Sequence, residues 1–62
     1  MEQKAIENFK GKQVKLKYHN GFNLIGTILE VYKDSILFKT KTASSLISLD
    51  EIGSLVEYKG GY

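Results

Sequence analysis

The chain has 62 residues, with nine basic and seven acidic side chains and a formal net charge of +2. All nine basic residues are lysines, and cysteine and proline are absent. This length predicts a single domain, residues 1–62, that buries only about 60% of its unfolded surface, so we expect self-association to support a marginal core. The composition excludes a disulfide framework, and no apolar run is long enough for a membrane span, which favours a cytoplasmic protein.

The chain has few residues of the types that bind metals or catalyse reactions. His19 is the only histidine, and without cysteine it cannot build a zinc site by itself. The neighbouring carboxylates Asp50 and Glu51 fall on a predicted exposed turn, which lacks the apolar pocket that separates an acid from a base. No nucleophile–base pair and no glycine-rich phosphate loop is present. We therefore expect no enzymatic activity, no metal and no cofactor.

Residues 1–10 have the pattern of a short helix. Ala5, Ile6 and Phe9 recur at helical spacing, and Gly11 follows as a C-terminal cap. Two turns of helix are unstable alone, so we expect this helix to dock on the rest of the chain.

From residue 13 the apolar pattern changes to the period of two that is typical of strands. It predicts strands over 13–19, 22–31, 36–41, 46–49 and 54–58, a tight helical turn over 50–53, and a frayed tail over 59–62. Gly26 interrupts the second strand and predicts a bend or bulge. A helix followed by five short, strongly bent antiparallel strands predicts a mainly β protein with a small SH3-like or OB-like barrel at 13–58.

The hairpin from Val14 to Val31 is the most informative stretch. Asn20 and Gly21 are typical of a two-residue type I′ turn, which would pair Lys17 with Leu24 and Leu16 with Ile25. In that register the core face carries Val14, Leu16, Tyr18 and Ile25, and the opposite face carries Lys15, Lys17, His19, Phe22 and Leu24. Apolar side chains on a basic face favour a binding role for Phe22 and Leu24. The alternative is partial burial under the helix or against a neighbouring subunit.

Residues 17–28 resemble the first motif of the Sm-like proteins, in which Asn-Gly is followed by alternating apolar residues and a bend glycine. With the short helix and residues 46–52, the chain is similar to the bacterial Hfq branch of that superfamily. The resemblance implies an Sm-like barrel whose fourth and fifth strands pair between subunits in a homo-oligomeric ring, a hexamer in preference to a heptamer. It also implies binding of single-stranded, A-rich or purine-rich RNA in post-transcriptional regulation, and an RNA chaperone activity. The implied RNA-binding residues are Lys17, Asn20, Gly21, Phe22, Leu24 and Tyr32, although Tyr32 could instead cover the barrel end.

The second motif departs from the Hfq pattern. Ser48, Leu49 and Asp50 stand where Hfq carries the Tyr-Lys-His of its uridine-binding pore. Asp34, Asp50 and Glu51 would repel phosphate there in every subunit. Two hypotheses follow: an Hfq-like ring that binds RNA on its hairpin face, or an Sm-like or SH3-like barrel that serves as a protein-interaction or scaffold module without RNA.

Overall fold

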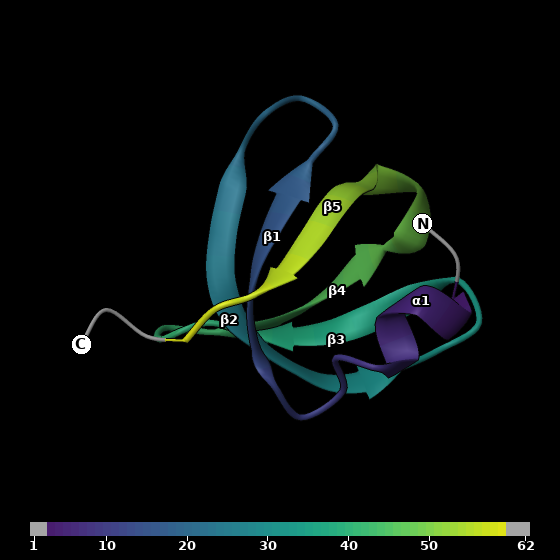
Figure 1. Cartoon of the computed structure of the whole chain (residues 1–62), viewed down its shortest axis with the longest axis horizontal. Helices are drawn as coiled ribbons and strands as arrows, with labels where there is room; N and C mark the ends of the chain where they lie inside the picture. Colours follow the sequence, from purple (N-terminus) through teal and green to yellow (C-terminus); the bar gives the residue numbers. More distant parts are fainter. Residues whose placement is uncertain (1–2, 60–62) are drawn as a thin grey trace.

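The computed structural model describes residues 3–59, which form one short helix and a single five-stranded antiparallel sheet (Figure 1). The strand order is β4-β3-β2-β1-β5, so β4 and β5 are the two edges of this sheet. The predicted mainly β fold with an N-terminal helix is confirmed. The elements are α1 (Gln3–Glu7), β1 (Gln13–Tyr18), β2 (Asn23–Val31), β3 (Ser35–Lys39), β4 (Ser44–Ser48), the 3-10 turn η1 (Leu49–Glu51) and β5 (Ile52–Glu57).

Helix α1 ends three residues earlier than predicted. Its last residue is Glu7, and Lys10 instead forms a parallel bridge with Ile28 of β2. Gly11 follows with a φ of 79°, and its N–H donates to the carbonyl of Ile28 at 2.7 Å. The predicted burial of Ile6 against the rest of the chain is confirmed, because this side chain is fully buried. After the helix, the backbone pairs with β2 instead of continuing as a helix. Residues 1–2 lie outside the described part of the chain.

The core lies inside the curve of the sheet, under α1. In β1 and β3 its members alternate, as the period of two requires. They are Ile6, Val14, Leu16, Ile28, Ile36, Phe38, Ile47, Leu49, Ile52 and Leu55. The prediction that Ile25 belongs to this core is wrong, because its side chain is 42% exposed.

Strand β2 changes partners near Gly26. Its outer half, residues 23–26, pairs only with β1, whereas its inner half, residues 27–31, pairs with β3. A Cβ at Gly26 would collide with the backbone carbonyl of Lys39 and would lie 2.9 Å from Cε2 of Phe38. A residue without a Cβ is therefore needed at this close approach. The prediction of a bulge at Gly26 is wrong, because the irregularity in pairing lies between Ile28 and Glu30.

The elements from β3 to β5 differ from their predicted bounds by one or two residues. β3 ends at Lys39 because Thr40 and Ala43 close a turn, with the Thr40 N–H donating to the Ala43 carbonyl at 2.8 Å. The predicted helical turn starts earlier, at Leu49, where the Ser48 hydroxyl accepts from the Asp50 N–H at 3.3 Å. β5 accordingly begins at Ile52. Among the described residues, no helix has the length and apolar character needed to cross a membrane.

Candidate functional site

The β1–β2 hairpin closes through a three-residue loop rather than the predicted two-residue turn. Tyr18 donates its N–H to the Phe22 carbonyl at 2.8 Å, and its own carbonyl accepts from the Gly21 N–H at 3.0 Å. Gly21 has a φ of 91°, and within residues 3–59 only glycines have a positive φ. A type I′ turn needs positive φ at both Asn20 and Gly21, so that prediction is wrong. The geometry is that of a turn followed by a left-handed glycine.

The extra loop residue shifts the strand register by one. Leu16 pairs with Leu24, Lys17 with Asn23, and Lys15 with Ile25. Because cross-strand partners point to the same face, a shift of one residue exchanges the faces of β2. Leu24 therefore lies on the core face with Leu16, and Ile25 lies on the lysine face. The predicted placement of Phe22 and Leu24 beside Lys17 is wrong.

An aromatic pair occupies the end of the hairpin. The rings of Tyr18 and Phe22 lie 6.2 Å apart at an interplanar angle of 41°. Phe22 is 61% exposed, while Tyr18 and Leu24 are half-buried and pack on the margin of the core. The Asn20 side-chain oxygen accepts from the Phe22 N–H at 2.9 Å, which holds the loop that leads into Phe22. We call Tyr18, Phe22 and Leu24 the aromatic tip.

The opposite face of the same hairpin carries positive charge. Lys15 stands between Ile25 of β2 and Val56 of β5, and Lys17 stands between Asn23 and Ser54. Ile25 and Val56 are exposed, at 42% and 54%. We call Lys15, Lys17, Ile25 and Val56 the lysine face. The structure thus places the predicted lysine and the predicted aromatic residue on opposite faces of the sheet formed by β2, β1 and β5.

Tyr32 is not brought to the aromatic tip. It follows the last residue of β2, at the other end of this nine-residue strand, and its N–H donates to the Ser35 carbonyl at 2.8 Å. Its side chain is 46% exposed. Of the six predicted site residues, the aromatic tip therefore holds Phe22 and Leu24, the adjoining loop holds Asn20 and Gly21, the lysine face holds Lys17, and Tyr32 stands apart.

The acidic turn η1 lies beside the hairpin. The His19 N–H donates to the Glu51 carbonyl at 3.1 Å, and the Asp50 and Glu51 side chains are exposed. The Leu49 N–H donates to the Asp34 carbonyl at 2.9 Å, which holds the β2–β3 turn against the same element. Within residues 3–59, no group of three or more His, Cys, Asp or Glu side chains could hold a metal ion.

Three contributors were not predicted from the sequence. They are Tyr18, as the ring partner of Phe22, and Ile25 and Val56, as exposed apolar side chains beside Lys15. The sequence feature that could have revealed the contact of Tyr18 with Phe22 is the position of Tyr18 directly before His19-Asn20-Gly21. A type I turn with glycine in the left-handed position closes on residues four apart, which brings positions 18 and 22 opposite each other.

The comparisons with known proteins agree with this fold. No protein-family model and no curated protein matches the sequence. Among solved structures, the chain is similar to the crystal structure of a protein described as the pleiotropic translational regulator Hfq. The identity is 30%, the match covers 89% of this chain and 86% of that one, and the TM-score is 0.79. The helix, the five-stranded bent sheet and this coverage establish that the chain belongs to the Hfq family of Sm-like proteins.

Proposed function

We propose that this protein binds single-stranded, A-rich or purine-rich RNA as a homo-oligomeric ring and acts in post-transcriptional regulation in the cytoplasm, with RNA chaperone activity. The observation that carries the proposal is the aromatic tip. A phenylalanine ring that is 61% exposed and tilted against a tyrosine offers a surface on which a base can stack. Membership of the Hfq family supports the same reading.

The two faces of the hairpin divide the work. Bases stack on Phe22 and pack against Tyr18 and Leu24, while Lys15 and Lys17 neutralise phosphates from the opposite face of the sheet. Within the described chain, β2 has no second strand partner over residues 23–26, so an RNA strand that crosses this open edge reaches both faces. Asn20 and Gly21 act through the loop geometry that orients Phe22.

The acidic groups of η1 argue against a uridine-binding pore at this turn. Asp50 and Glu51 are exposed on η1, next to the position of His19, and Ser48 and Leu49 supply neither an aromatic ring nor a cation. A negative potential at this turn repels phosphate. Tyr32, at the far end of β2, contributes only if a neighbouring subunit brings it to the bound strand.

The edges of the sheet support the ring. In residues 3–59, β4 and β5 each pair with only one strand, and each exposes a large apolar side chain, Leu46 at 65% and Val56 at 54%. Open edges of this kind pair readily with another copy. We propose that β4 of one subunit pairs with β5 of the next, and that six subunits close the ring in preference to seven. Native mass spectrometry of the intact assembly distinguishes the two numbers.

The test of RNA binding is fluorescence anisotropy of labelled oligo-A and oligo-U with the wild-type protein, Phe22→Ala and Leu29→Ala. Leu29 is the matched control because it is an exposed apolar residue in the inner half of β2. We expect oligo-A to bind more tightly than oligo-U. Because stacking of one base contributes about 1–3 kcal/mol, Phe22→Ala should weaken oligo-A binding by about tenfold or more, and Leu29→Ala should not.

A protein that forms the ring but binds neither RNA would overturn the proposal. It would favour the alternative, a scaffold module that kept the fold without RNA, which the replacement of the Tyr-Lys-His pattern by Ser48, Leu49 and Asp50 also favours. Equal losses in Phe22→Ala and Leu29→Ala would place the RNA elsewhere.

A further inference from the structure

The dipeptide Asn20-Gly21 combines two features that favour a chemical change of the chain itself. Asparagine is thermolabile, because the main-chain nitrogen that follows it can attack its side-chain amide. The chain has three asparagines, Asn8, Asn20 and Asn23, and all three are exposed. Asn20 alone is followed by glycine, which has no Cβ to crowd the attacking nitrogen. The hairpin loop therefore holds the asparagine most open to this reaction.

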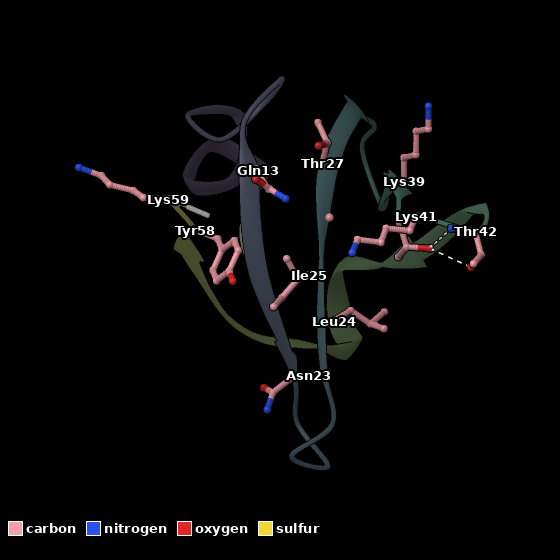
Figure 2. Close-up of a pocket in the computed structure, with 12 residues that line it drawn as sticks. Gln13, Asn23, Leu24, Ile25, Thr27, Lys39, Lys41, Thr42, Tyr58 and Lys59 are labelled. Carbon is pink, nitrogen blue, oxygen red and sulfur yellow. Dashed lines mark hydrogen bonds between the residues drawn. The ribbon is translucent and has the colours of Figure 1, made fainter. Parts of the chain in front are cut away.

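The fold leaves this loop open to water. The loop projects beyond the rest of the sheet in Figure 1, and Figure 2 shows it in close-up with Asn23 labelled where β2 begins. Apart from its two chain neighbours, no heavy atom of the described chain lies within 4 Å of the position that a Cβ on Gly21 would take. Water therefore reaches the dipeptide, and no neighbouring element blocks a movement of the loop.

The other two asparagines precede residues that are held by the core. Phe9, which follows Asn8, packs against the core, and its N–H donates to the Ile6 carbonyl at 2.8 Å. Asn23 lies within β2 and is followed by Leu24, whose side chain also packs against the core. In both cases an anchored, bulky residue carries the nitrogen that would have to attack. The fold therefore adds to the contrast that the sequence predicts.

Two hydrogen bonds of the loop act on the reacting atoms in opposite directions. The Gly21 N–H donates to the Tyr18 carbonyl at 3.0 Å, and this bond must open before the nitrogen can attack. The Asn20 Oδ1 accepts from the Phe22 N–H at 2.9 Å. Negative charge develops on this oxygen when the attacked carbon becomes tetrahedral, and a backbone N–H that already points at it stabilises that charge. The reaction therefore requires one of these bonds to open while the other persists.

We propose that Asn20 is a site of spontaneous deamidation that inactivates the aromatic tip. The Gly21 nitrogen bonds to Cγ of Asn20 and gives up its proton, Nδ2 leaves as ammonia, and a cyclic succinimide forms. Water then opens the succinimide. Cleavage of the bond between the nitrogen and Cγ gives aspartate. Cleavage of the bond between the nitrogen and the main-chain carbonyl carbon gives isoaspartate, whose main chain runs through Cβ and Cγ.

Both products weaken RNA binding at the aromatic tip, a consequence that rests on the proposed function. Either product places a carboxylate close to Phe22, where it repels phosphate. Aspartate keeps an acceptor for the Phe22 N–H. Isoaspartate adds a carbon atom to the main chain of the loop, so it displaces Phe22 relative to Tyr18. We therefore expect isoaspartate to reduce RNA binding more than aspartate does.

The first test follows the full-length wild-type protein, native and unfolded in urea, during incubation at physiological temperature in mildly alkaline buffer. Mass spectrometry of proteolytic peptides locates the mass increase that replacement of an amide by a carboxylate produces. In the native protein we expect Asn20 to convert at least about tenfold faster than Asn8 and Asn23, because its follower has no Cβ. Conversion confined to the unfolded chain, or equal rates at the three asparagines, would overturn the proposal.

The second test measures oligo-A binding by anisotropy before and after the incubation. Asn20→Gln is the matched variant, because its longer side chain forms the corresponding larger ring far more slowly. We expect the wild type to lose about tenfold in affinity as Phe22 is displaced, and Asn20→Gln to keep the affinity of its own fresh sample. Asn8→Asp adds the same charge outside the hairpin and should bind as the wild type does.

The two tests separate this proposal from the proposed function. Complete conversion of Asn20 without a loss of affinity for oligo-A would overturn the inactivation. An equal loss of affinity in Asn20→Gln would also overturn it, because the loss would then arise elsewhere in the chain. Conversion of Asn20 in a protein that binds no oligo-A when fresh would support the modification site while contradicting the proposed RNA site.

Discussion

The two halves of β2 show how one strand serves both stability and binding. The inner half, residues 27–31, pairs with β3 and inserts Ile28, which is fully buried, into the core. The outer half, residues 23–26, pairs with β1 alone and leaves Ile25 42% exposed. The outer half, which pairs with β1, carries the surfaces proposed for ligands, and the inner half, which pairs with β3, contributes Ile28 to the core.

The sharpest test of this contrast uses two isoleucines three residues apart. Ile28→Ala and Ile25→Ala remove the same atoms from the same strand, one from the core and one from the surface. We expect Ile28→Ala to lower the free energy of unfolding by about 4 kcal/mol, because truncation of a buried isoleucine also leaves a cavity. Ile25→Ala should lower it by less than about 1 kcal/mol. Urea unfolding followed by circular dichroism, at equal protein concentration, measures both.

The reverse order would restore the register with Lys17 opposite Leu24. Similar losses in the two variants would mean that the outer half contributes as much packing energy as the inner half, and the comparison would fail.

Gly26 marks the boundary between the halves, and its replacement should be the next most damaging change. In Gly26→Val the new side chain meets the backbone carbonyl of Lys39, which cannot rotate away, so β2 and β3 must separate. We expect a loss of about 3 kcal/mol, at the upper end of overpacking. Lys17→Ala, on the exposed face of β1, should change the free energy of unfolding by no more than about 0.5 kcal/mol. Equal thermal midpoints of the two variants would contradict the close approach at Gly26.

Substitutions at Gly21 and Asn20, in the loop at the hairpin end, should have unequal effects on the free energy of unfolding. Gly21→Ala places a Cβ on a residue with a φ of 91°, and we expect a cost of about 1–2 kcal/mol. Asn20→Asp keeps an acceptor for the Phe22 N–H, and with no positive φ at position 20 it should leave the stability close to that of the wild type. Thermal unfolding of the two variants measures the difference. Similar losses at both positions would indicate the type I′ turn.

The sequence was sufficient for the fold and for much of the local chemistry. Strand periodicity, Gly26 and the motif around Asn20 and Gly21 led to an Sm-like architecture, because burial on one side of a strand leaves a clear pattern of two. The pairing register of β1 and β2 could not be predicted, because Asn-Gly is compatible with hairpin loops of two or three residues. That one-residue difference decided which of Leu24 and Ile25 is exposed.

The smallest predicted effect concerns the lysine face, and it tests whether binding spans both faces of the hairpin. Lys17→Gln should leave the free energy of unfolding unchanged but reduce the salt dependence of oligo-A binding. Each phosphate contact with a single strand contributes about 0.7 to the slope of log affinity against log salt concentration. We expect the slope to fall by about that amount, with Lys33→Gln, in the exposed β2–β3 turn, as the control of equal charge. If both variants lower the slope equally, Lys17 acts through the overall charge of the protein. If only Lys17→Gln lowers it, the bound strand must reach the lysine face as well as Phe22, and RNA must cross the edge of the outer half to do so.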